Sequence, residues 1–318
     1  MERREFLVVG GALAASMALP ARAAYPEKPV RYIIAFAPGG ESDIVARLQQ
    51  EVWRKKFPSG AELVIESKAG AGGALAWSQL NQFPGDGYTV MGTNLPHIVL
   101  QPLEGNVQYK TDDITNVNFF NYTPDGIVVR NESPFKTFQD FVAAAKANPG
   151  KLNLAGSGTN SANHAAHERL NAALGIKTTY VAFKGTGDLI ASLLGGHVDG
   201  AMSYSSLALS QKGKTRLIAI ATPQRLSYFP DTPTFRELGI DWVDGAYRGV
   251  GMPRSTPEEL RRRVSEIFSE IGRDAEFRRK MTEQGLEIVD IPYDKMAAFM
   301  EERKKAYVAS ARLLGLTK

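Results

Sequence analysis

The chain contains no cysteine among its 318 residues, so it can form neither a disulfide nor a thiolate nucleophile. A fold without disulfides depends on burial of its core, and a chain of this length with 43% hydrophobic residues is long enough for two α/β domains. The formal net charge is only +4, and no basic stripe interleaved with aromatic residues occurs. Nucleic acid is therefore not an expected partner.

The fingerprints of nucleotide binding and of hydrolases are missing too. Residues 70–72 begin like a dinucleotide-binding loop, but Leu75 stands where that loop needs its third glycine. No P-loop sequence occurs, and residues 156–158 do not form a nucleophile elbow. His164 and His167 share a helix face in an order that matches no zinc-protease motif, and we interpret one as lying near a cleft and the other on the surface. We predict no catalytic residue, no metal site and no cofactor.

The first 23 residues have the pattern of an export signal. Arg3 and Arg4 precede an apolar stretch over residues 6–19, and residues 21–23 form an Ala-x-Ala cleavage site. The arginine pair resembles a twin-arginine signal, but its flanking residues depart from the usual form, so the ordinary secretory route stays open. The stretch is too short for a stable membrane span, and no other stretch approaches that length. We expect a soluble periplasmic protein that starts at Ala24 after cleavage.

What the sequence does contain is a recurring order of short apolar strand, loop of small residues and helix. In its first occurrence residues 32–36 are the strand, Gly39 and Gly40 make the turn, and an amphipathic helix begins near Ser42. The same order returns twice, with strands at 63–66 and 152–155, loops at 70–73 and 156–161, and helices at 74–82 and 165–174. Such loops either make tight turns or present unpaired helical N–H groups that attract carboxylates and phosphates. Because ligands of open α/β sheets lie at the carboxyl ends of strands, a binding site is expected at these loops.

Other segments are predicted from the same kinds of signal. A strand at 88–91 leads to a fourth loop at 93–97, whereas the polar segment 101–123 is predicted to be connecting structure. Thr137 and Asp140 form a capping box for the next helix, which Asn148, Pro149 and Gly150 end. Further strands are expected at 127–130, 180–183, 217–221 and 286–289.

Two charged residues stand out within these elements. Asp43 lies in the first turn of the helix after Gly40, where it complements the helix dipole, holds the glycine loop from beneath, or does both. Arg248 lies in the otherwise apolar, glycine-punctuated segment 246–251. A guanidinium in such a strand must find an acceptor, and either an internal carboxylate or a ligand carboxylate would serve.

Six segments in fixed order extend over nearly the whole chain after the signal. They are YPEKPVRYIIAFAPGGESDIVAR, ESKAGAGGALA, GDGYTVMGTN, SPFKTFQDFVAAAKANPGKLN, VAFKGTGDLIASLLGGHVDGAM and PDTPTFRELG. Together they resemble the solute-binding component of tripartite tricarboxylate transporters, the Bug or TctC family. The resemblance implies a two-lobed α/β periplasmic binding protein, type II-like, with two Rossmann-like lobes joined by hinge strands. We expect residues 24–125 and 246–318 in one lobe and residues 126–245 in the other.

The resemblance also implies a function and a site. A monomer would capture a small carboxylate (a di- or tricarboxylate, or an aromatic or amino acid) and deliver it to the membrane permease subunits of the transporter. Loop amides of residues 36–42 would hold the carboxylate, residues 157–161 would face them, and Asp199 matches an aspartate of the family's Gly-Gly-x-x-Asp segment. Tyr247 stands where many members have tryptophan, which leaves the ligand's identity open. An exported α/β enzyme acting on an anionic substrate and a sensor subunit feeding a kinase are the alternatives.

The resemblance and the strand-end loops together define the predicted ligand-binding residues. They are Phe36, Ala37, Gly39, Gly40, Ser42, Asp43, Gly72, Gly73, Thr93, Asn94, Ser157, Gly158, Thr159, Asn160, Ser161, Asp199 and Arg248.

Overall fold

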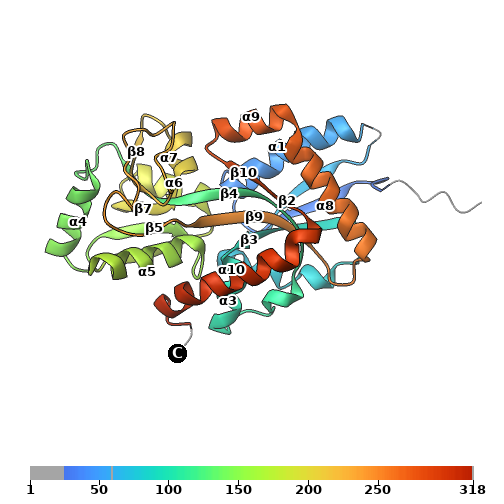
Figure 1. Ribbon diagram of the computed structural model, residues 1–318, viewed down its shortest axis with the longest axis horizontal. Coiled ribbons are helices and arrows are strands. Elements are labelled where there is room, and N and C mark those ends of the chain that lie inside the picture. Colours follow the sequence, from blue (N-terminus) through green and yellow to red (C-terminus); the bar gives the residue numbers. More distant parts are fainter. Residues whose placement is uncertain (1–24, 59, 317–318) are drawn as a thin grey trace, which may run out of the picture.

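The computed structural model describes residues 25–58 and 60–316, whose strands form one curved, mixed sheet with helices packed on both faces (Figure 1). The strand order is β2-β1-β3-β9-β4-β7-β5-β6, and β8 and β10 also pair with β4. The strands are β1 (Val30–Ile34), β2 (Leu63–Ser67), β3 (Thr89–Leu95), β4 (Thr115–Arg130), β5 (Asn153–Ser157), β6 (Thr179–Phe183), β7 (Gly200–Tyr204), β8 (Thr215–Ile220), β9 (Gly245–Met252) and β10 (Glu287–Ile291).

The long strand β4 joins two halves of this sheet. Its first part runs antiparallel to β9 as far as the pair Pro124–Gly245, and its last part runs antiparallel to β7 from the pair Asp125–Tyr204 onward. We call the half that contains β1, β2, β3, β9 and β10 half A, and the half that contains β5, β6, β7 and β8 half B. Within each half the strands that precede glycine loops are parallel, so their carboxyl ends meet at one edge.

Helices cover each half on both faces, and the apolar side chains form four main clusters between helices and sheet. In half A, α1, α8 and α9 lie on one face and α2, α3 and α10 on the other, while half B has α4 and α5 on one face and α6 and α7 on the other. Trp53, Trp77 and Trp242 are fully buried, one in each of three clusters. The helices are α1 (Glu41–Lys56), α2 (Ala74–Trp77), α3 (His97–Glu104), α4 (Phe138–Ala147), α5 (Ala162–Leu174), α6 (Thr186–Leu194), α7 (Ser205–Ser210), α8 (Glu258–Arg273), α9 (Ala275–Glu283) and α10 (Tyr293–Leu313).

The C-terminal helix α10 links the halves a second time. It packs on α3 and α8 of half A and on α5 of half B, and it runs beneath both halves in Figure 1. Three short 3-10 turns complete the elements: Ala71–Gly73, Leu80–Gln82 and Thr111–Asp113. Within the described part of the chain, no helix combines the length and the apolar character that a membrane crossing requires.

Several predicted elements are confirmed. The strand and helix around Gly39 and Gly40 correspond to β1 and α1, although the strand ends at Ile34. The predicted capping box is present at the start of α4, where the Thr137 side chain accepts from the Asp140 backbone N–H and Asn148 is the C-cap residue. The helix expected over 74–82 is shorter, because α2 ends at Trp77. The helix α6 and the strand β7 have no counterpart among the predicted elements.

Two predictions about the segment after residue 92 are wrong. Thr93 and Asn94 are not in a loop but belong to β3, every residue of which is buried. The segment 101–123 is not connecting structure, because it contains the end of α3 and more than half of β4. Two of its asparagines in β4 are buried and donate across the core: the side-chain amide of Asn118 donates to Ser269 Oγ at 2.9 Å, and that of Asn121 donates to the carbonyl of Glu287 at 2.9 Å. The polarity of these asparagines therefore reflects hydrogen bonds across the core and not exposure to solvent.

Candidate functional site

A small hollow lies where half A meets half B, at the carboxyl ends of the parallel strands. Its volume is about 10 Å³, which is roughly the space that one water molecule needs. The two halves are therefore closed on one another around this hollow. Half A contributes Phe36, Gly40, Glu41, Ser42, Asn94, His97 and Arg248, and half B contributes Ser157, Thr186 and Tyr204.

The closed contact depends on glycines that face each other across the two halves. A Cβ atom on Gly187, at the start of α6, would lie 2.1 Å from the carbonyl oxygen of Pro38. A Cβ atom on Gly158 would lie 2.6 Å from the Cα atom of Gly72. Because real Cβ atoms do not approach backbone atoms so closely, only glycine permits this approach at Gly158 and Gly187. The glycine loops are thus more than tight turns: they are the surfaces along which the halves meet.

Two helix N-termini meet at the hollow. The N-cap residues of α1 and α6 are Gly40 and Gly185, and neither has a side chain that could cap its helix. A Cβ atom on Gly40 would lie 3.5 Å from the amide nitrogen of Gly187 and 3.6 Å from that of Thr186. Unpaired N–H groups and the positive ends of two helix dipoles therefore converge, which is an environment that attracts a carboxylate.

The glycine turn before α1 is held from beneath. Asp43 Oδ2 accepts from the backbone N–H of Gly39 at 2.9 Å and from Arg47 Nε at 3.0 Å. Asp43 is only 6% exposed, so its carboxylate is oriented by these two donors. The prediction that this residue holds the loop rigid is confirmed, and its place in the first turn of α1 also suits the helix dipole.

The loop over residues 157–161, predicted to face the glycine turn, uses most of its donors within half B. The backbone N–H and the hydroxyl of Ser157 both donate to Asn163 Oδ1, at 3.0 and 2.7 Å. The N–H of Gly158 donates to the carbonyl of Phe183, and the N–H of Asn160 donates to His164 Nδ1. Of this loop only Ser157 lines the hollow, and the residue that faces Gly40 is Thr186 with its neighbour Gly187.

The other predicted ligand-binding residues do not line the hollow. Gly72 touches Gly158 across the two halves, and Thr93 is buried in β3 with no partner for its hydroxyl. Asp199 lies elsewhere: its Oδ2 accepts from the N–H of Asn153 at 2.8 Å, at the start of β5, whereas Ser157 and the hollow are at the other end of that strand. The structure brings together six predicted residues: Phe36, Gly40, Ser42, Asn94, Ser157 and Arg248.

Arg248 lies beside an internal carboxylate and also lines the hollow. Its Nη2 lies 3.7 Å from Glu41 Oε2, so an internal carboxylate is present, yet the guanidinium also lines the hollow. Its Nη1 donates to Asn121 Oδ1 at 3.0 Å and to Thr123 Oγ1, and its Cζ atom lies 5.0 Å from the centre of the Tyr204 ring. Its Nε is buried and has no hydrogen-bond partner.

His97 gives the hollow a neutral, aromatic wall. It is 1% exposed and packs edge-on against Phe36 and Trp77, with ring centroids 5.4 and 6.2 Å away. Burial, with a smaller contribution from the nearby Arg248 charge, lowers the pKa of His97 to about 3. The imidazole is therefore uncharged at neutral pH, and its buried Nδ1 has no partner.

Four residues of the hollow are absent from the predicted set: Glu41, His97, Thr186 and Tyr204. Thr186 has a sequence signal, because Gly185 and Gly187 flank it between a strand and a helix, in the order already seen around Gly40. Glu41 has no such sequence signal, because an acidic residue in the first turn of a helix is ordinarily explained by its interaction with the helix dipole.

The two histidines of α5, His164 and His167, make contacts within half B. His164 stacks on Tyr180 with ring centroids 4.5 Å apart. His167 is 1% exposed and bonds Glu168 and Thr178, whereas the side chain of His164 is 23% exposed, and neither histidine lines the hollow. In residues 25–58 and 60–316 no cluster of side chains suited to a metal ion occurs.

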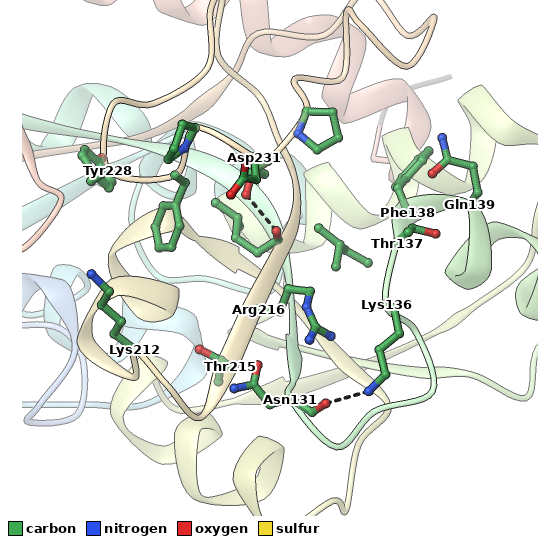
Figure 2. A pocket seen from close by; sticks show the side chains of 16 residues that line it. Asn131, Lys136, Thr137, Phe138, Gln139, Lys212, Thr215, Arg216, Tyr228 and Asp231 are labelled. Atoms are coloured by element: carbon green, nitrogen blue, oxygen red, sulfur yellow. Dashed lines mark hydrogen bonds between the residues drawn. The ribbon is translucent and has the colours of Figure 1, made fainter.

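A larger hollow, of about 530 Å³, lies in half B alone (Figure 2). It is lined by residues 131, 136–139, 212, 215–218 and 228–233. In Figure 2 the guanidinium of Arg216 extends toward Asn131 and Lys136, and Lys136 Nζ donates to the carbonyl of Asn131 at 2.8 Å. This hollow includes no strand-end glycine loop and no residue of half A. The smaller hollow between the halves is the better candidate, because helix N-termini and a buried guanidinium converge there.

Comparison with known proteins shows the family to which the chain belongs. The family described as "Tripartite tricarboxylate transporter family receptor" (TctC) matches residues 45–314. The UPF0065 protein of the gbd 5' region of Cupriavidus necator is 30% identical over 330 residues, which cover 100% of this chain and 99% of that protein. The structure of the periplasmic binding protein BugD superposes with a TM-score of 0.85 at 26% identity, covering 92% of this chain and 100% of that one. MatC from Rhodopseudomonas palustris with bound malate superposes with a TM-score of 0.81 at 27% identity, covering 90% of this chain and 100% of that one.

Proposed function

Because the chain belongs to the tripartite tricarboxylate transporter receptor family, we propose that it captures a small carboxylate between halves A and B and delivers it to the membrane subunits of such a transporter. The protein is thus a periplasmic solute-binding protein of the TctC/Bug type. The observation that carries the proposal is the meeting of two uncapped helix N-termini, beside the Arg248 guanidinium, in a hollow closed by both halves. The similar protein MatC holds malate, a dicarboxylate, which supports a carboxylate ligand here.

We further propose that the two halves are lobes that open and close on the ligand. The first lobe comprises residues 24–125 and 246–318 and the second comprises residues 126–245. The proposal is supported by the change of partner along β4, which pairs with β9 up to Pro124 and with β7 from Asp125. The hollow of about 10 Å³ has room for no more than about one water molecule, so the halves must separate to admit a carboxylate ligand.

We propose that the protein captures its ligand without transforming it. The family is a receptor family, and the hollow contains no pair of a nucleophile and an activating base among the described residues that line it. Ser157 lines the hollow, but its hydroxyl donates to the Asn163 amide oxygen, which cannot act as a base. Action as a monomer and delivery to permease subunits are parts of the proposal.

Carboxylates should raise the thermal stability of the protein. A ligand at about 100 times its dissociation constant stabilises the folded state by about 2.7 kcal/mol through mass action. A thermal-shift screen of mono-, di- and tricarboxylates should find at least one ligand that raises the melting temperature, and the amide of the same compound should not. A screen in which neutral sugars raise the melting temperature and no carboxylate does so would contradict the proposal.

We also propose export to the periplasm with cleavage between Ala23 and Ala24, by the twin-arginine or the general secretory route. The predicted signal lies outside the described residues, and the proposal is supported by its sequence pattern together with membership of a periplasmic family. The intact mass of protein recovered from the periplasm should correspond to a chain that starts at Ala24. A mature mass that still includes Met1 would overturn this proposal without affecting the binding function.

A further inference from the structure

The hollow of about 530 Å³ in half B has the size of a small-molecule site, since such sites usually enclose about 300–1,000 Å³. The strand β8 contributes residues 215–218 to its lining, the start of α4 contributes residues 136–139, and a third wall is the segment 228–233 (Figure 2). Every described residue that lines it belongs to half B. A ligand can therefore occupy this hollow without closure of the two halves.

The wall over residues 228–233 is held in place by the protein itself. Thr232 Oγ1 donates to the carbonyl of Leu217, on β8, at 2.9 Å. Arg225 Nη1 donates to the carbonyl of Pro230 at 3.0 Å. Because these bonds already fix the wall, a ligand would not have to order it, which lowers the entropic cost of binding.

The charges around this hollow are not balanced. Three cationic side chains line it, those of Lys136, Lys212 and Arg216, against one carboxylate, that of Asp231. The lining therefore has an excess of two positive charges. A concave surface with such an excess attracts anions.

Arg216 has a buried donor that no acceptor satisfies. Its Nη1 is shielded from solvent and has no hydrogen-bond partner in the part of the chain that the structure describes. Its guanidinium extends toward Asn131 and Lys136 in Figure 2, where Lys136 Nζ donates to a backbone carbonyl, which carries no net charge. The acid in the first turn of α4, Asp140, already accepts from the backbone N–H groups of Lys136 and Thr137. An oxyanion in the hollow would supply the acceptor that Arg216 lacks.

The same hollow offers an apolar surface and further donors. Phe229, Pro230 and Pro233 line it, and the Phe229 ring is half-buried. Phe138 and Gln139 line it as the first two residues of α4, whose N–H groups have no acceptor within their own helix. The lining thus combines groups that bind an anion with groups that pack against an apolar body.

We propose that the hollow of half B is a second binding site, separate from the one between the halves, and that it binds a small dianion attached to an aromatic ring. Arg216 and Lys136 hold the anion beside the start of α4, and the ring packs against Phe229 and the two prolines. A guanidinium forms parallel hydrogen bonds with phosphate and carboxylate oxygens alike, so an aryl phosphate and an aromatic dicarboxylate share the required chemistry. This inference goes beyond carboxylate capture between the halves and does not depend on it.

Calorimetric titration of the Gly187→Ala variant tests the second site apart from the first. The added Cβ atom would lie 2.1 Å from the carbonyl oxygen of Pro38, so this variant cannot close its halves on a ligand. The ligands used are benzene-1,2-dicarboxylate and phenyl phosphate, which is a dianion above about pH 7 because the second pKa of a phosphate monoester is about 6. At least one of them should bind one-to-one. It should bind at least about tenfold more tightly than phenol, which lacks the charge, and than succinate and inorganic phosphate, which lack the ring.

Substitutions of the cations locate this binding. Arg216→Gln should lower the affinity for the aromatic dianion about tenfold or more, because the planar pair of donors is lost. Lys136→Gln should cause a smaller loss, because Lys136 is exposed to solvent, and it serves as the test if Arg216→Gln fails to fold. Lys214→Gln is the matched control: Lys214 is exposed, lies in the turn before β8 and does not line the hollow, so this variant should bind as the Gly187→Ala protein does.

The outcomes separate the second site from the proposed function. Binding that is seen in the wild type and lost in Gly187→Ala would place the aromatic dianion between the halves and overturn the inference. An affinity that neither Arg216→Gln nor Lys136→Gln lowers would overturn it too, as would the absence of any binding by both aromatic dianions. Each of these results leaves carboxylate capture by the wild type intact. If an aromatic dianion binds Gly187→Ala through Arg216 while no carboxylate binds between the halves of the wild type, the second site stands and the proposed function is wrong.

Discussion

Gly187→Ala should weaken carboxylate binding by about 100-fold or more, the largest effect expected from adding a single methyl group to this protein. The added Cβ atom would lie 2.1 Å from the carbonyl oxygen of Pro38 and 3.2 Å from its carbonyl carbon, and both are backbone atoms of the opposite half. The halves can then no longer close, although each keeps its own core. The free energy of unfolding should change by no more than about 1 kcal/mol, since alanine is favoured over glycine in a helix. Calorimetric titration and denaturant unfolding measure the two quantities.

Gly272→Ala is the matched control for this experiment. Gly272 is also in a helix, α8, and a Cβ atom there would meet nothing within 4 Å. This variant should bind ligand as the wild type does. Gly40→Ala should have an intermediate effect, because its Cβ atom would lie 3.5 Å from the nearest atom of α6, which is ordinary contact. Wild-type affinity in Gly187→Ala would show that the halves do not close through this contact when ligand binds.

Arg248→Gln should reduce both ligand affinity and stability. The hollow loses the guanidinium that lines it, and the buried Glu41 carboxylate loses the cation beside it. Removing one member of a fully buried pair costs about 3–5 kcal/mol of the free energy of unfolding. The loss here should approach the lower end of that range, because Nη2 and Oε2 are 3.7 Å apart and Ser206 still donates to Glu41. Affinity for the best carboxylate should fall by about 100-fold.

Arg248→Lys tests whether the positive charge of Arg248 is sufficient or whether the planar guanidinium is also needed. Lysine restores the positive charge beside Glu41 but cannot present two parallel donors, so it should recover most of the stability and little of the affinity. Denaturant unfolding and titration on the same preparations compare the two variants. A large loss of stability in Arg248→Gln with unchanged affinity would make Arg248 a purely structural partner of Glu41.

The sequence locates one side of the site better than the other. Residues Gly39 and Gly40 follow a strand of apolar residues and precede an amphipathic helix, so their place at a strand end follows from local patterns alone. The half B side of the site depends on which of its loops lies against Gly40 when the two halves are in contact. The loop 156–161 and the loop 184–187 both follow strands and both contain glycine, and only the packing of the halves shows that Thr186 and Gly187 meet Gly40.

Residues whose role depends on distant partners could not be predicted. Glu41 has the appearance of a first-turn acid, and its buried position beside Arg248, more than 200 residues later in the chain, follows from the pairing of β3 with β9 next to β1. Asp199 matches a family segment by sequence, but it binds the start of β5 at the far end of the strand from the hollow. The first part of the strand β4 could not be predicted from the sequence, because its buried asparagines make it look polar. Their hydrogen bonds to residues of α8 and β10 appear only in the folded structure.

Native mass spectrometry of the purified protein tests the central claim most directly. The protein is incubated with an equimolar mixture of mono-, di- and tricarboxylates, amino acids, sugars and polyamines, and the bound species is identified by its mass after release. The account predicts a one-to-one complex with a molecule that carries a carboxylate, and it predicts that Gly187→Ala loses this complex. A complex with a neutral sugar or a polyamine, or no complex with any member of the mixture, would contradict it.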